Sequence, residues 1–141
     1  MKIIGFNLTK ISADRMDEFK SHFSINTTIE FTEIEKTKTD IIPNTDTIKI
    51  DFKYSISYLE NEKKTVKQGE ILFQGFLLLA TEKEETRDII KSWKKKELTG
   101  TVKVPLFNFI LRKCTGKAMS LEEDINIPHH LAIPQAELKK D

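Results

Sequence analysis

Apolar and polar residues alternate strictly between residues 48 and 58. The apolar positions are Ile48, Ile50, Phe52, Tyr54, Ile56 and Tyr58, and the residues between them are Lys49, Asp51, Lys53, Ser55 and Ser57. Because successive side chains of a strand point to opposite faces of a sheet, this pattern predicts a strand with one buried and one solvent-facing side. We therefore expect Phe52 to be buried and Lys53 to face solvent.

A second apolar run, from Ile71 to Ala80, follows after the polar tip Asn61–Lys64. Two strand-like runs joined by a short polar tip predict an antiparallel hairpin. Ile71, Phe73, Leu77 and Leu79 share one face of this run, and Leu72, Phe76, Leu78 and Ala80 share the other. We expect the second face to be covered by another subunit or by a bound apolar partner. Gly75, in the middle, indicates a bulge or a close approach of a neighbouring backbone.

Two further strands precede the hairpin. Apolar and polar residues alternate in Lys2–Ser12, and β-branched residues are frequent in Thr27–Lys38. Between these strands, Met16, Phe19 and Phe23 have the spacing of a short amphipathic helix, but the same residues could anchor an extended crossover on the core. The sequence leaves both alternatives open.

The helical signals all come later in the chain. Thr81 and Glu84 form a T-x-x-E capping box, and the segment ends in the basic run Lys94–Lys96, so a surface helix is predicted between them. Pro105 is typical of a first helical turn and opens a longer helix, which Gly116 could interrupt.

The longer helix is apolar over more than half of its circumference. Its apolar residues are Leu106, Phe107, Phe109, Ile110, Leu111 and Cys114. Such a helix packs on the sheet with one side and on something else with the other, so we expect Phe107, Phe109 and Ile110 to form an oligomer interface. The tail, residues 127–134, contains two prolines and is expected to run extended.

These elements predict an α+β fold in which a four-stranded antiparallel sheet carries C-terminal helices on one face, as one domain over residues 1–141. The 23 Lys and Arg residues nearly balance the 22 Asp and Glu residues, which argues against nucleic-acid binding driven by charge. The single cysteine, the lack of a signal-type N-terminus and the lack of a run of about 18 apolar residues favour a cytoplasmic protein without membrane insertion.

Three groups of residues could carry chemistry, and each has a structural explanation. Cys114 could be a nucleophile with His129 or His130 as its base, but its place late in an apolar helix face favours a core thiol. The two histidines could bind a metal, yet zinc needs three or four ligands and only His22 remains.

The basic run around Trp93 could bind single-stranded nucleic acid. Its members are Lys91, Trp93, Lys94, Lys95 and Lys96. The favoured explanation is a helix C-terminus complemented by lysines, with Trp93 holding the helix on the sheet. Glu122 and Glu123 look like a solvated helix face. Since no Gly-rich phosphate loop is present either, we expect no catalytic residue, no metal and no cofactor.

The order of elements resembles that of the SecB-like protein-export chaperones, from about Ile4 to Pro134. The residues that carry the resemblance are Val104-Pro105-Leu106-Phe107 at the start of the long helix, then Leu121 after Gly116, and then Ile125-Asn126-Ile127-Pro128. This series is similar to the family's helix, break and "L-N-L-x-P" ending.

The resemblance implies a homotetramer, a dimer of dimers, whose long helices lie between sheets and whose apolar grooves hold unfolded polypeptides. Relatives that deliver clients to the export ATPase carry a strongly acidic surface, whereas this chain has a balanced charge. A dedicated client, such as the antitoxin-like partner that some relatives serve, is therefore as compatible with the sequence as general export.

The resulting hypothesis is an ATP-independent holdase that shields extended apolar segments of unfolded polypeptides. Candidate client-binding residues are Leu72, Phe76, Leu78, Leu131 and Ile133. The alternatives are a single-stranded nucleic-acid-binding protein and a structural oligomer subunit that binds no client.

Overall fold

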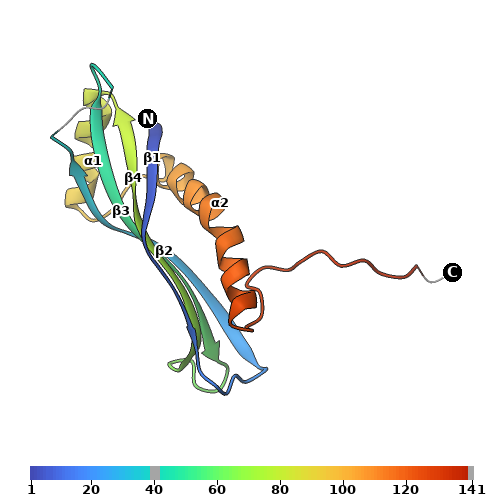
Figure 1. The fold of residues 1–141 in the computed structure, drawn as a ribbon. Helices are drawn as coiled ribbons and strands as arrows, with labels where there is room; N and C mark the ends of the chain where they lie inside the picture. The colour runs from blue at the N-terminus through green and yellow to red at the C-terminus, as the bar shows by residue number, and fades with distance from the viewer. Residues whose placement is uncertain (39–41, 140–141) are drawn as a thin grey trace.

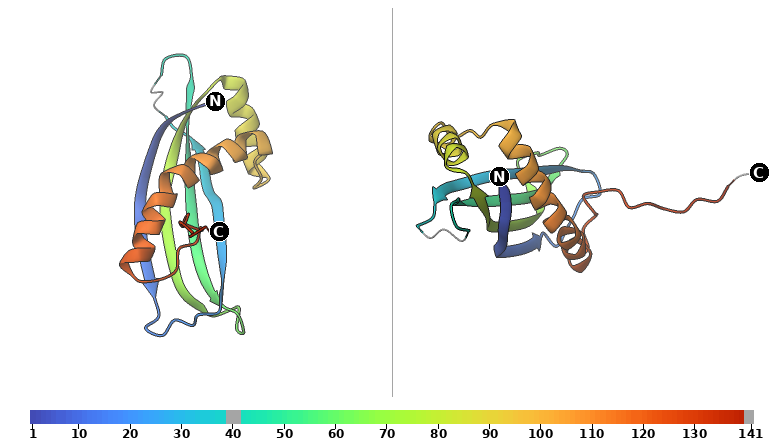
Figure 2. Two further views of the ribbon diagram at one scale, coloured as in Figure 1. Left: turned by 90° about the vertical axis from the view of Figure 1, so that its right-hand side faces the viewer. Right: turned by 90° about the horizontal axis from the view of Figure 1, so that it is seen from above.

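The computed structural model describes residues 1–38 and 42–139, which form one sheet and two helices (Figure 1). The elements are β1 (Lys2–Arg15), β2 (Phe23–Lys36), β3 (Asp46–Glu60), β4 (Lys67–Thr81), α1 (Lys83–Lys94) and α2 (Gly100–Asp124). The strands are antiparallel in the order β1-β4-β3-β2, and both helices lie on the same face of the sheet (Figure 2). The predicted α+β architecture is confirmed.

The alternation along β3 places its apolar side chains under the helices. Phe52, Tyr54 and Ile56 are buried in the same core as Leu106 and Ile110 of α2. Lys53 and Ser55, which lie between them, point to the other face and remain partly exposed. The predicted register of β3 is therefore confirmed, and we call its two sides the helix-covered face and the open face.

Helix α2 contacts the sheet through a single line of residues, each four positions after the last. Leu106, Ile110, Cys114, Ala118 and Glu122 are all fully buried along this line. Residues four apart lie nearly above one another on a helix, so the line forms one continuous seam. Helix α2 crosses the sheet diagonally (Figure 2).

The apolar flanks of α2 are partly covered by the sheet of the same chain. The Phe107 ring lies 5.1 Å from the Phe31 ring of β2, and the Phe109 ring lies 5.7 Å from the Phe6 ring of β1. Ile110 is fully buried and has no surface left for a partner. The apolar width of the helix is therefore largely explained within the chain, because an aromatic side chain from each edge strand contacts one of its flanks.

Both helices begin one or more residues away from their predicted starts. Glu82, rather than Thr81, is the N-cap of α1, and the Glu82 N–H donates to the Glu85 carboxylate. Thr81 ends β4, where its hydroxyl pairs with that of Thr86 at 2.7 Å. The sequence T-x-x-E was a plausible box, but the extended backbone of β4 continues one residue further than the pattern could show.

Helix α2 starts at Gly100, so Pro105 lies inside it rather than in its first turn. The helix also runs unbroken through Gly116. Glycine costs about 1 kcal/mol in a helix interior. The packing of the seam on both sides of this exposed position outweighs that local cost.

The segment between β1 and β2 is an extended crossover, which settles the alternative that the sequence left open. Residues 16–22 form no helix. The Phe19 ring packs 5.6 Å from Phe23 and 5.9 Å from Tyr58, with edge contacts between the rings. Aromatic anchoring on the sheet, rather than helical amphipathicity, explains the spacing of these phenylalanines.

We expect Phe52→Ala to lower the free energy of unfolding by about 3–5 kcal/mol, because it leaves a cavity in the centre of the helix-covered face. Denaturant melts monitored by circular dichroism measure this loss. The neighbouring Lys53→Ala variant, on the open face, is the control and should stay within about 0.5 kcal/mol of the wild type. A loss below about 1 kcal/mol for Phe52→Ala would place β3 at the periphery of the core.

We expect Gly75→Ala to destabilise the pairing of β1 with β4. A Cβ atom at Gly75 would lie 2.2 Å from the backbone oxygen of Asn7, so β1 would have to move. At Gly116 no atom lies within 4 Å of such a Cβ. Gly116→Ala should therefore stabilise α2 by about 0.5–1 kcal/mol, and equal effects of both variants in thermal melts would contradict this account.

Candidate functional site

Three of the predicted client-binding residues form a small apolar patch on the open face. Leu72, Phe76 and Leu78 lie on β4, and we call them the open-face patch. Leu72 is only 7% exposed, whereas the other two are half-buried. The ammonium group of Lys49 lies 4.8 Å above the Phe76 ring. A shallow hollow of about 430 Å³ beside Phe76 is lined mainly by polar residues, so the patch offers little apolar area by itself.

The other two predicted residues lie on the C-terminal tail, which leaves the molecule from the helix-covered side. Leu131 is 49% exposed and Ile133 is 45% exposed. From residue 131 to residue 139 every residue is exposed, and the chain extends away from the sheet (Figure 1). The structure therefore does not bring the five residues together, since the sheet separates the tail from the open-face patch.

The tail is held at its root by a buried polar cluster of Tyr58, Glu122 and His130, which we call the root cluster. Glu122 is 0% exposed and accepts a hydrogen bond from the Tyr58 hydroxyl at 2.5 Å. Its carboxylate also accepts the His130 backbone N–H at 3.0 Å and lies 2.9 Å from His130 Nδ1. The Tyr58 hydroxyl lies 2.5 Å from the Pro128 carbonyl oxygen as well.

The expectation that Glu122 belongs to a solvated helix face is wrong. Glu123 is exposed, and its carboxylate lies 3.2 Å from His129 Nε2, but Glu122 occupies the last position of the buried seam. The signal was present in the sequence, because Glu122 follows Ala118 by four residues in the register of Ile110 and Cys114. A charged residue type hid that register.

Burial changes the acidity of three groups near the seam. Burial, followed by the hydrogen bond to Glu122, raises the pKa of the Tyr58 hydroxyl, which therefore keeps its proton and remains a donor. Burial raises the pKa of Tyr54 to about 12, and within the described residues its hydroxyl has no hydrogen-bond partner. Burial raises the pKa of Cys114 to about 11, which confirms a core thiol rather than a nucleophile.

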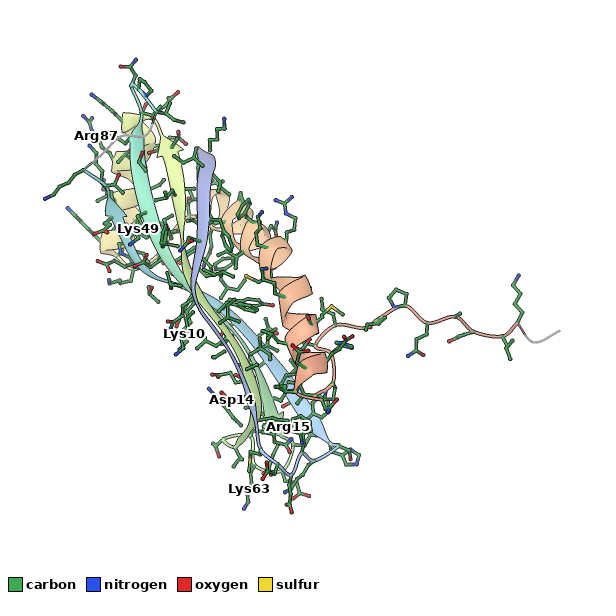
Figure 3. All side chains as sticks on the ribbon, in the orientation of Figure 1. Lys10, Asp14, Arg15, Lys49, Lys63 and Arg87 are labelled. Carbon is green, nitrogen blue, oxygen red and sulfur yellow. The ribbon has the colours of Figure 1, made fainter. Side chains whose placement is uncertain are left out.

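Arg15 forms a second restraint on the root of the tail (Figure 3). Its Nη1 atom donates to the carbonyl oxygens of Ile125 at 3.3 Å and Asn126 at 2.7 Å. These carbonyls follow the C-terminal end of α2, where the helix dipole favours a cation. Asn126 adopts a left-handed conformation with φ 53°, which ends the helix and turns the chain back toward β3.

A partly exposed apolar surface adjoins the tail root. It consists of Phe19, Phe23 and Ile25, and we call it the crossover surface. Phe23 lies 5.7 Å from the Tyr58 ring, and Ile25, which is 37% exposed, pairs with Tyr58 across the sheet. Tyr58 therefore contacts both the crossover surface and the tail. The sequence assigned Phe19 and Phe23 to a short amphipathic helix or to a crossover anchored on the core, and it did not place them beside the tail, because the return of the tail to β3 has no local signal.

The remaining candidates show no converging chemistry. Lys96 lies 4.7 Å above the Trp93 ring, and Trp93 packs against the core, as its structural explanation predicted. No three metal-binding side chains converge within residues 1–38 and 42–139. Over the same ranges, neither helix has the length and apolar character that crossing a membrane requires.

The comparisons with known proteins identify a fold. No protein-family model matches the chain, and no curated protein matches it. Among solved structures, the SecB-like chaperone of Mycobacterium tuberculosis, in complex with a ChAD peptide from the HigA1 antitoxin, is similar with a TM-score of 0.50 and 12% sequence identity. The match covers 97% of this chain and 92% of that one. The chain has a SecB-like fold.

Proposed function

We propose that this protein is an ATP-independent chaperone that binds extended apolar segments of unfolded or partly folded polypeptides. The observation that carries the proposal is the exposed apolar tail, which is anchored beside the crossover surface in a SecB-like fold. The structural neighbour is a chaperone solved with a bound peptide, and we extend polypeptide binding to this chain on that basis.

Burial of client side chains supplies the binding energy in this proposal. Removing apolar surface from water is worth about 25 cal/mol per Å², less the cost of ordering both partners. Such binding needs no nucleotide and no catalytic group. We expect the client to be released chemically unchanged. The protein is therefore proposed to be a binding protein rather than an enzyme.

Leu131 and Ile133 are the proposed client contacts on the helix-covered side, together with the crossover surface. The open-face patch is a second proposed contact, which could equally be covered by another copy of the chain. We also propose that the chain assembles as a homotetramer, with Phe107 and Phe109 near the interface because both keep some exposure.

We expect the protein to suppress aggregation of chemically unfolded model proteins at near-stoichiometric ratios. Light scattering of diluted citrate synthase and of a second unrelated client measures this effect. Raising the salt concentration about tenfold should change protection little, because the interaction is burial of apolar surface. Nucleic-acid binding through the lysines would instead weaken steeply with salt. Failure to delay aggregation of either client would contradict general chaperoning.

We expect the double variant Leu131→Ser/Ile133→Ser to weaken client protection several-fold without loss of fold, because both side chains are solvent-exposed. Phe76→Ser measures the contribution of the open-face patch separately. The matched surface control is Lys94→Glu/Lys95→Glu, which should leave protection nearly intact. Equal protection by the tail variant and the wild type would remove the tail from the binding surface.

A further inference from the structure

We infer that the root cluster is a positioning device, in which Glu122 and Tyr58 fix the root of the tail so that residues 131–139 act as an arm over a bound apolar segment. This inference rests on the proposed function for the role of the arm. It does not depend on that function for the role of the cluster, which stands on the contacts of Tyr58, Glu122 and His130.

The restraints on the tail are concentrated in a few residues. Ile127 is buried in the core, the Pro128 carbonyl lies 2.5 Å from Tyr58 Oη, and His130 contacts Glu122 through both its backbone and its ring. Beyond His130, every residue through Lys139 is exposed. Within the described residues, the contacts of the tail with the rest of the chain thus end at His130, and the residues after it are exposed.

Glu122 is the one seam residue whose side chain is not explained by packing. The other four seam residues have small or apolar side chains, and a buried carboxyl group is costly unless its oxygens are hydrogen-bonded. Within residues 1–38 and 42–139, every hydrogen bond of the Glu122 side chain goes to Tyr58 or His130. The carboxyl group therefore stabilises the position of the tail root rather than the contact of α2 with the sheet.

The hydrogen atoms of the cluster explain why an amide could replace this carboxyl group. Tyr58 has one hydroxyl hydrogen and two oxygen atoms at 2.5 Å, from Glu122 and Pro128. The Tyr58 hydroxyl and the His130 backbone N–H both point at the same oxygen of Glu122, Oε2. With its amide oxygen in the place of Oε2, a glutamine accepts both hydrogen bonds and turns its amide nitrogen toward His130 Nδ1, whereas alanine forms none of these contacts.

A fixed root would favour binding by an extended arm. Pro128 and Pro134 keep the tail from becoming helical, and the segment Leu131–Ala136 carries no charged side chain. Holding the root beside the crossover surface lowers the entropy that the arm loses when it closes on a bound segment. The chemistry of the arm fits an extended apolar stretch of polypeptide.

The test measures tail order and binding separately in the full-length protein. Hydrogen–deuterium exchange of the peptide that spans residues 125–133 reports the root, and fluorescence anisotropy with labelled, reduced and carboxymethylated α-lactalbumin reports binding. The variants are Glu122→Ala, Glu122→Gln and Tyr58→Phe. Tyr54→Phe is the matched control, because this buried hydroxyl has no partner within the described residues.

Loss of two or more hydrogen bonds should speed exchange at the root about tenfold or more in Glu122→Ala, and Tyr58→Phe should show a smaller increase. Probe affinity should fall several-fold in the same order. Glu122→Gln and Tyr54→Phe should match the wild type in both measurements. If Glu122→Ala does not fold, Tyr58→Phe, which removes a single oxygen atom, decides the outcome.

Unchanged exchange at the root in a folded Tyr58→Phe protein would overturn the positioning role. Faster exchange with unchanged probe affinity would overturn the role of the arm. If the wild type itself does not bind the probe, the proposed function fails for unfolded proteins and the arm fails with it. The exchange data would still decide whether the cluster positions the tail, so the two failures are distinguishable.

Discussion

The packing of one seam of α2 on the helix-covered face is the contact on which the other features depend. Four apolar or small side chains at every fourth position bring the helix diagonally across the sheet. This contact buries Cys114 and leaves the open face without a helix. It also brings the end of α2 close to Arg15 of β1. The fifth seam residue, Glu122, then connects the helix to the tail.

The surfaces proposed to bind clients follow from where the seam ends. Because α2 stops near β1, the chain turns at Asn126 and returns to β3, where Tyr58 meets both the tail and the crossover surface. Exposed apolar side chains therefore adjoin the buried polar root cluster. This combination suits the binding of varied extended segments, since burial tolerates many sequences while the root cluster limits the entropy that is lost.

The sequence predicted features that depend on local pattern and missed those that depend on distant contacts. The alternation from Ile48 to Tyr58 was sufficient for the strand and its buried face, and the polar tip before the second apolar run was sufficient for the antiparallel hairpin. The start of α2 was placed too late, because Pro105 is tolerated inside a helix whose seam is well packed. Glu122 was misassigned because its charge hid its place in the seam. Its partners come from elsewhere in the fold, Tyr58 from β3 and His130 from the returning tail. The five predicted client contacts were chosen as apolar residues, and the sequence could not show that the sheet divides them.

The central claim is that unfolded polypeptide binds on the helix-covered side, at the tail and the crossover surface. Methyl NMR of isoleucine- and leucine-labelled protein, titrated with an unlabelled unfolded client, tests it most directly. The account predicts that the methyl signals of Ile25, Leu131 and Ile133 broaden or shift first. Changes confined to Leu72 and Leu78 on the open face, or no change at saturating client, would contradict it.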